Sequence, residues 1–207
     1  MDENYERNVF VNCPLDEEYE PILQAVLFCI VHLGFLPRLS VSRADGGEDR
    51  LRKIVEHIEA SKYSIHDLSR ARASKADEIF RLNMPFELGI DYAFRNAMAD
   101  HRSKKFLVFE GKRFEAKAAL SDLSGCDFEI HDNNYERAIG EVRNFLVNEA
   151  GARADGKALI ISRYHDFGAW YWEKQADAGS SEADIRDYPT REVLRAMLEW
   201  VSRGEPI

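Results

Sequence analysis

The sequence lacks the cysteine pattern of a disulfide-rich or zinc-binding protein. Its three cysteines, Cys13, Cys29 and Cys126, are odd in number and show neither a CxxC pair nor a His-paired spacing. We therefore expect reduced thiols and no metal site, as is typical of a cytoplasmic protein. A membrane-spanning run is also missing, because the longest apolar stretch, 25–36, is too short to cross a bilayer.

Positive charge is scarce as well. The chain has 28 Lys and Arg residues against 37 Asp and Glu residues, which gives a net charge of -9. This balance argues against a nucleic-acid-binding surface, because such surfaces need many basic side chains to neutralise phosphates. It still allows a local pocket that holds one small anion. The polar, acidic N-terminal residues predict no signal peptide.

The remaining composition is that of a folded protein, with 45% hydrophobic and 31% charged residues. A length of 207 residues fits one domain with an appendage, or one large domain. Helical patterns alternate with short β-rich segments at 9–13, 35–41, 63–68, 105–110 and 128–131. This alternation predicts an α/β fold in which helices cover both faces of a parallel sheet.

We expect the common arrangement for such a chain, a flavodoxin-like five-stranded parallel sheet with the strand order 2-1-3-4-5. The segment 151–156 (GARADG) predicts a boundary between an α/β domain over 1–150 and a helical C-terminal extension over 151–207. The extension carries several aromatic residues. We expect them to pack on the α/β domain or on a second copy of the chain.

Ligands of such sheets bind at the carboxyl ends of the strands, where the strand order reverses. In this chain that point lies between the first and third strands, and the third strand ends at Asp67. The neighbouring strand ends and the start of the next helix supply the predicted substrate-binding residues Asn12, Cys13, Pro14, Asp16, Ser69, Asn83, Met84 and Glu110. We expect Asn83 to be the N-cap of that helix, with Pro85 in its first turn.

Glu87 is a carboxylate on a strongly apolar helix, and Asp91 follows one turn later on the same face. Burying an unpaired carboxylate costs several kcal/mol, so such a residue usually has a function. Two structural alternatives remain open. Glu87 could stabilise its own helix or pair with an arginine, and Asp67 could cap the following loop. Arg38 could bind a phosphate or form a surface ion pair.

Two carboxylates at this edge suit the cleavage of an N-glycosidic bond. One can lie beneath the oxocarbenium-like transition state, and the other can bind the sugar hydroxyls. We assign these roles to Glu87 and Asp67, respectively. If the leaving group is nicotinamide, it is already cationic and needs no general acid. We expect no cofactor.

Four segments resemble one family in order along the chain: FVNCPLDEEY (10–19), SIHDLSR (64–70), NMPFELGID (83–91) and SDLSGCD (121–127). They are similar to a TIR-like family related to the nucleoside 2-deoxyribosyltransferases. The resemblance covers about residues 8–148. It implies that Glu87 is the catalytic Glu and Asp67 the sugar-binding acid, and it adds Asp122 to the predicted binding residues.

The resemblance also implies a small-molecule nucleotide or nucleoside partner, a homo-oligomer and a role as a bacterial effector in anti-phage defence. We expect cleavage of NAD with release of nicotinamide. One alternative is a nucleoside 2-deoxyribosyltransferase or nucleoside N-glycosidase acting at the same site. Another is a nucleotide-sensing or self-associating module without catalytic turnover. No membrane or nucleic-acid partner is expected.

Overall fold

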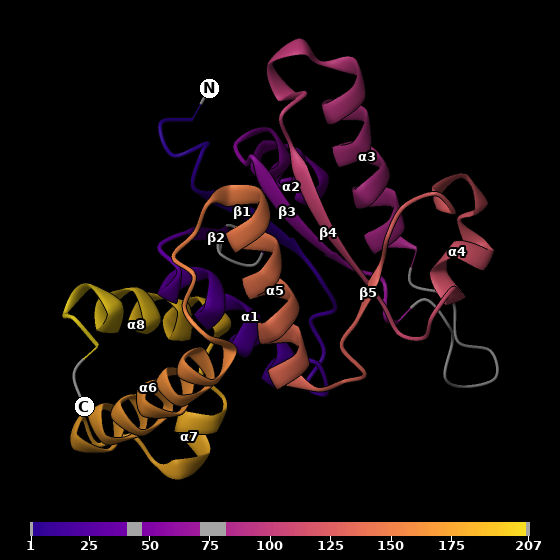
Figure 1. Ribbon diagram of the computed structural model, residues 1–207. Coiled ribbons are helices and arrows are strands. Elements are labelled where there is room, and N and C mark those ends of the chain that lie inside the picture. Colours follow the sequence, from indigo (N-terminus) through magenta and orange to yellow (C-terminus); the bar gives the residue numbers. More distant parts are fainter. Residues whose placement is uncertain (1, 41–46, 71–81, 206–207) are drawn as a thin grey trace.

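The computed structural model describes residues 2–40, 47–70 and 82–205. Its centre is a five-stranded, all-parallel sheet with the order β2-β1-β3-β4-β5, which confirms the predicted α/β fold and strand order (Figure 1). The strands are β1 (Asn8–Asn12), β2 (Leu36–Arg38), β3 (Tyr63–Asp67), β4 (Lys105–Glu110) and β5 (Glu129–Ile130).

Helices cover both faces of the sheet. One face carries α1 (Glu20–His32) and α5 (Tyr135–Ala150), and the other carries α2 (Arg50–Glu59) and α3 (Asn83–Ala97) (Figure 1). A short helix, α4 (Glu115–Ala119), lies between β4 and β5 in the chain. Local sequence fixes several helix ends: Asp49 and Asn134 accept backbone N–H groups at the starts of α2 and α5. Gly151 ends α5 in the left-handed conformation, with φ 65°.

The two edge strands are shorter than the sequence patterns suggested. β2 pairs with β1 over three residue pairs, from Asn8 with Leu36 to Phe10 with Arg38, and the expected continuation at 41 lies outside the described residues. β5 contains two residues, Glu129 and Ile130, and they lie opposite Phe109 and Glu110. The first half of β4 therefore has only β3 as a strand neighbour in the described part of the chain.

The C-terminal helices are α6 (Lys157–Asp177), α7 (Glu182–Arg186) and α8 (Thr190–Ser202). α6 and α8 pack on α1, α7 packs on α6, and apolar residues of all three belong to the same core cluster as α1, α5 and the sheet. Phe28 of α1 shows the contact directly, because its ring lies 5.4 to 5.8 Å from the rings of Tyr164, Phe167 and Trp200. Apolar residues lie on all sides of α1, so the helix has to pack against the C-terminal helices as well as against the sheet.

Within the described ranges, no helix combines the length and the apolar character needed to cross a bilayer.

Candidate functional site

A pocket of about 290 Å³ lies at the carboxyl edge of the sheet, beyond the ends of β3, β4 and β5. The loops that follow these strands line it, with Ser69, Arg70, Gly111, Lys112, Glu115, His131, Asp132 and Asn133. Its lining carries two cationic side chains, Arg70 and Lys112, and two acidic ones, Glu115 and Asp132. The pocket therefore has the place expected of a ligand site in such a sheet, with a lining of mixed charge.

Asp67 lies beneath this pocket, and its carboxylate is fully buried. Oδ2 accepts hydrogen bonds from the Tyr19 hydroxyl at 2.5 Å and from His131 Nε2 at 2.8 Å. Oδ1 accepts the backbone N–H of Ser69 at 2.8 Å. Burial alone would raise the pKa of Asp67, but the hydrogen bond and charge of His131, with the Ser69 and Tyr19 donors, lower it. Asp67 therefore caps its own loop and also holds two side chains in place.

His131 connects Asp67 to the pocket. The backbone N–H of Asn133 donates to His131 Nδ1 at 3.1 Å, so Nε2 is the ring nitrogen whose N–H donates to Asp67. Asp132 and Asn133 both have positive φ, 51° and 52°, in a loop that lines the pocket. Such conformations are more common for Asp and Asn than for other L residues, and they concentrate at functional sites. The sequence offered one signal for His131, its place at the end of the fifth strand.

Glu87 has a different environment. It is 6% exposed, and no described residue donates a hydrogen bond to its carboxylate. Burial raises its pKa, and the positive charge of Arg50 opposes this only in part. α3 has no acid in its first turn, so Glu87 lies beyond the reach of a helix-capping role. The burial of this carboxylate is the feature that the sequence pattern predicted.

Cys13, just beyond the end of β1, lies within electrostatic range of both acids. Burial and the negative charges of Asp67, Glu20 and Glu87 raise the pKa of its thiol well above the ordinary value. The thiol is therefore protonated and is a poor nucleophile. Glu87 does not line the pocket above Asp67. The two predicted catalytic residues thus flank the end of β1 without sharing that pocket.

The first turn of α3 is anchored by Asn12 rather than by a cap of its own. Asn12 Nδ2 donates to the Met84 carbonyl at 3.0 Å and lies 3.0 Å from His66 Nδ1. The prediction that Asn83 is the N-cap was wrong, because the helix already includes Asn83 and the cap residue is Leu82, which makes no side-chain cap bond. The physical reason is that the side chain that holds the first turn of α3 comes from β1 and not from a residue next to the helix in the sequence.

Asp91 belongs to a buried polar network on the α3 side of the sheet. Its Oδ2 accepts the Ser64 hydroxyl at 2.5 Å and lies 3.2 Å from His66 Nε2. Its Oδ1 lies 3.1 Å from Nζ of Lys104, which is also buried and donates to the Ile58 carbonyl at 2.7 Å. The carboxylate is fully buried and is held by three side chains. Asp91 therefore supports α3 from within and has no access to the pocket.

The other predicted binding residues have structural surroundings of their own. Glu110 accepts the backbone N–H groups of Phe114 at 2.7 Å and Ala116 at 3.2 Å, so it fixes the loop that lines the pocket. Asp16 accepts the backbone N–H of Tyr19 at 3.1 Å. Arg38 lies on β2. Asp122 lies on an exposed turn, and Pro14 lies on the buried loop after β1.

Gly111 brings two loops into close contact at this pocket. A Cβ at this position would lie 2.7 Å from the Ser69 carbonyl oxygen, a backbone atom that cannot turn aside. We expect Gly111→Ala to lower the free energy of unfolding by about 1–3 kcal/mol, as overpacking does. Chemical denaturation measures this loss. Gly125→Ala is the matched control, because a Cβ there meets no atom within 4 Å, and an equal loss in both variants would contradict the contact.

The described residues contain no cluster of three or more His, Cys, Asp or Glu side chains that could hold a metal ion.

Comparison with known proteins gives no relative: no family model matches the chain, and no curated protein and no solved structure matches it significantly.

Proposed function

We propose that the protein cleaves an N-glycosidic bond in NAD or a related nucleotide and releases the base. The observation that carries this proposal is the carboxylate of Glu87, which lies in a buried position on α3 and has a pKa raised by burial. A carboxylate shielded from water interacts strongly with a positive charge that develops beside it. The oxocarbenium-like transition state of glycosidic cleavage develops such a charge.

In this mechanism the bond between C1′ of the ribose and the ring nitrogen of the base breaks, and its electron pair leaves with the base. Nicotinamide leaves as a neutral molecule, so no acid has to protonate it. Glu87 stabilises the positive charge on the sugar. Water then adds to C1′ and loses a proton. Asp67, which already accepts three hydrogen bonds, acts by holding Ser69 and His131 at the pocket.

The pocket suits the phosphate part of such a substrate. Arg70 and Lys112 line it, and an arginine with a lysine is a common combination for phosphate binding. Arg70 also pairs with Glu18 at 3.0 Å, which fixes the position of its guanidinium. All three cysteines are free thiols, which fits the expected cytoplasmic setting.

The experiment that tests this function is incubation of the purified protein with NAD and, separately, with a panel of nucleosides and deoxynucleosides, followed by mass analysis. We expect free nicotinamide and ADP-ribose from NAD. Exchange of bases between deoxynucleosides without loss of NAD would favour the transferase instead. Tight binding of NAD without any product after long incubation would contradict catalysis and favour a sensing module.

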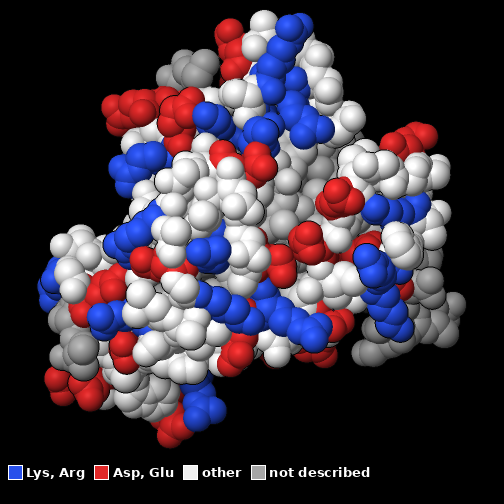
Figure 2. Space-filling model, in the orientation of Figure 1, with Lys and Arg blue, Asp and Glu red and all other residues white. Residues whose placement is uncertain are grey.

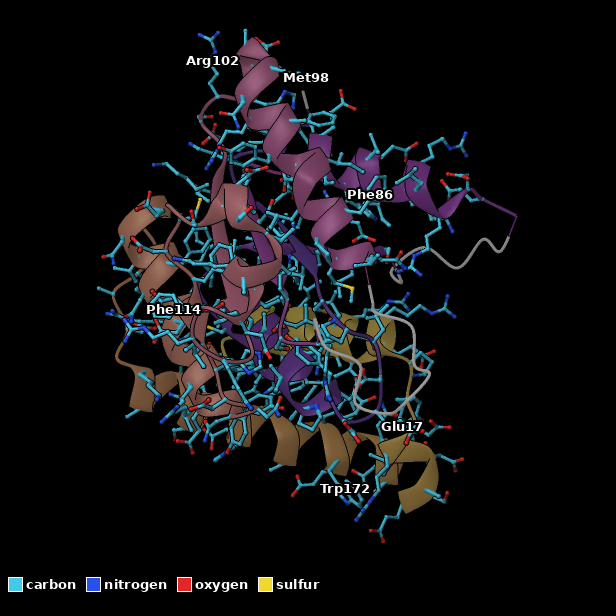
Figure 3. The ribbon with its side chains drawn as sticks, turned by 90° about the vertical axis from the view of Figure 1, so that its right-hand side faces the viewer. Glu17, Phe86, Met98, Arg102, Phe114 and Trp172 are labelled. Atoms are coloured by element: carbon cyan, nitrogen blue, oxygen red, sulfur yellow. The ribbon has the colours of Figure 1, made fainter. Side chains whose placement is uncertain are left out.

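We also propose that the protein associates with itself through the outer surface of α3. No exposed residue of this helix carries a charge, and four large apolar side chains on or beside it are exposed: Leu82 at 67%, Phe86 at 58%, Tyr92 at 38% and Met98 at 45%. Figure 3 shows Phe86 and Met98 projecting away from the helix into solvent. The only partly exposed charge of the helix, Arg95, lies 4.9 Å from the centre of the Tyr92 ring, and a surface with so little charge can pack against its own copy with little repulsion.

Phe86→Glu is expected to weaken this self-association by roughly thirtyfold, the effect of losing a hot-spot side chain worth about 2 kcal/mol. Light scattering over a range of protein concentrations measures the change. Phe114→Glu is the matched control, since Phe114 is a similarly exposed aromatic, at 61%, directly before α4 and away from α3. A monomer at all concentrations in the wild type, or an equal effect of both substitutions, would contradict the role of α3.

A further inference from the structure

The first half of β4 has an edge that no described strand covers. The Lys105 N–H donates to the Lys62 carbonyl, and the Phe109 carbonyl accepts from Leu68, so the peptide groups of these odd-numbered residues face β3. Successive peptide groups alternate in direction along a strand, so those of Phe106 face the opposite side. β5 starts only at Glu129, opposite Phe109. The N–H and C=O of Phe106 are therefore open to a new strand.

This open edge forms the floor of a groove of about 380 Å³. Arg95 of α3 lines one side, α5 lines the other, and the chain that enters β5 closes one end. The α5 wall consists of Glu141, Asn144, Phe145, Asn148 and Glu149. Figure 2 shows this part of the surface as a hollow beside α5 with acidic side chains at its border. The groove thus offers backbone hydrogen bonds at its floor and polar side chains on its walls.

The groove has more acidic than basic residues in its lining: Asp127, Glu129, Glu141 and Glu149 against Arg95 and Lys105. Burial and the negative charges of Glu141 and Asp127 raise the pKa of Glu129, and the positive charge of Arg113 opposes this only in part. The two basic residues of the groove already have partners within it. Lys105 pairs with Glu149 at 2.9 Å, and the Arg95 guanidinium lies 4.4 Å from the centre of the Phe106 ring. A ligand with positive charge would relieve the repulsion among the acids.

Two other occupants fit the groove less well. Its carboxylates are not among any cluster of described residues able to hold a metal ion. A second copy of this chain, paired edge to edge, would bring two sets of Asp127, Glu129 and Glu141 together, and like charges placed in this way repel. The occupant that matches both the free backbone edge and the charge is an extended, basic chain.

We propose that this groove binds an extended segment of a partner protein that carries Lys or Arg at alternate positions. The segment adds a short strand to the free edge of β4 in line with β5. Its peptide groups bond to those of Phe106, and its basic side chains lie against Glu129 and Glu141. This interaction is separate from the N-glycosidic chemistry proposed above, because the groove shares no lining residue with the pocket beyond β3.

The test uses a fluorescent acetyl-Lys-Val-Lys-Val-Lys-amide probe and fluorescence anisotropy with the full chain. We expect binding that weakens at high salt, and at least about tenfold weaker binding to Glu129→Lys, which reverses one charge. The acidic peptide Glu-Val-Glu-Val-Glu is expected not to bind. Equal affinity for Glu129→Lys, or no binding of the basic peptide at low salt, would overturn the proposal.

A second measurement separates strand addition from simple charge attraction. Phe106→Pro removes one N–H on the free edge and no bond to β3, and we expect it to abolish probe binding, whereas Phe106→Leu retains it. In the wild type, the probe should slow hydrogen exchange of the Phe106 amide, a readout that does not depend on the folding of a variant. Strand addition would be contradicted if spermidine displaced the probe when added at an equal concentration of positive charge. An unchanged exchange rate of the Phe106 amide would contradict it as well, because both results indicate charge attraction alone.

Discussion

Glu87→Gln is expected to abolish nicotinamide release and at the same time to stabilise the fold. The neutral amide cannot compensate a developing positive charge, so we expect turnover to fall by about 10²–10³-fold. The same substitution removes a buried carboxylate whose charged form is disfavoured by burial, and we expect the free energy of unfolding to rise by roughly 1–3 kcal/mol. Product assays and urea unfolding of the same preparation measure the two changes.

The gain in stability depends on pH in a defined direction. Burial raises the pKa of Glu87 above its ordinary value of 4.5 in the folded protein. The folded chain then binds this proton more tightly than the unfolded chain, so the wild type loses stability as pH rises from below 4.5 through the folded pKa. We therefore expect the difference between Glu87→Gln and the wild type to disappear in acid and to be complete at neutral pH.

Glu136→Gln is the control for this experiment, because Glu136 is an acid in the first turn of α5. Its replacement should leave turnover unchanged and lower stability slightly, by about 0.3–1 kcal/mol. If Glu87→Gln also keeps full turnover and loses stability, Glu87 has a structural role and the proposed catalytic role is wrong.

Lys104→Met is expected to cause the largest loss of stability, about 3–5 kcal/mol, which is typical of breaking a buried ion pair. The substitution leaves Asp91 buried with Ser64 and His66 as its only side-chain partners, and it also removes the donor to the Ile58 carbonyl. Urea or thermal unfolding measures the loss. Lys105→Met is the matched control, because Lys105 is exposed and its ion pair with Glu149 lies at the surface, where such pairs contribute less than about 1 kcal/mol.

A double variant tests whether the loss arises from the pair itself. In Lys104→Met with Asp91→Leu, no unpaired charge remains, so the loss should be smaller than the sum of the two single losses. Additive losses would contradict the coupling. The stability that Asp91 contributes should also disappear in acid, because His66, Lys104 and Ser64 outweigh burial and lower its pKa below the ordinary 3.8. Its contribution is present above that value and is lost as pH falls through the folded pKa.

The sequence predicts the sheet well because its signals are local. β4 begins at Lys105 and ends at Glu110, as the pattern KFLVFE indicates, and α5 begins at Tyr135, directly after the Asn134 cap. The short strand β5 is less predictable, because two residues carry almost no periodicity. The start of α3 at Asn83 agrees with the sequence pattern, but the N-cap role of Asn83 was wrong, and the side chain that binds the first turn, Asn12, is 72 residues away from Met84 in the chain.

The candidate site is predictable only in part, for a related reason. The pattern around Glu87 correctly suggested a buried carboxylate, because an apolar helix with one acid is a local signal. The partners of Asp67 are not local: Tyr19 is 48 residues away, and His131 is 64 residues away. Lys104 gave no signal at all, because a lysine that precedes a strand is usually exposed. These contacts depend on tertiary packing, which a single sequence does not encode in its periodicity.

The shared core of α1 and the C-terminal helices has a consequence for the timing of folding during synthesis. α1 emerges from the ribosome early, but the rings that cover Phe28 lie on α6 and α8, up to Trp200. Until those residues have been translated, one side of an apolar helix remains without cover. The chain therefore cannot complete its core domain by domain as it is made. We expect the nascent chain to depend on chaperones for longer than a protein whose first 150 residues close upon themselves.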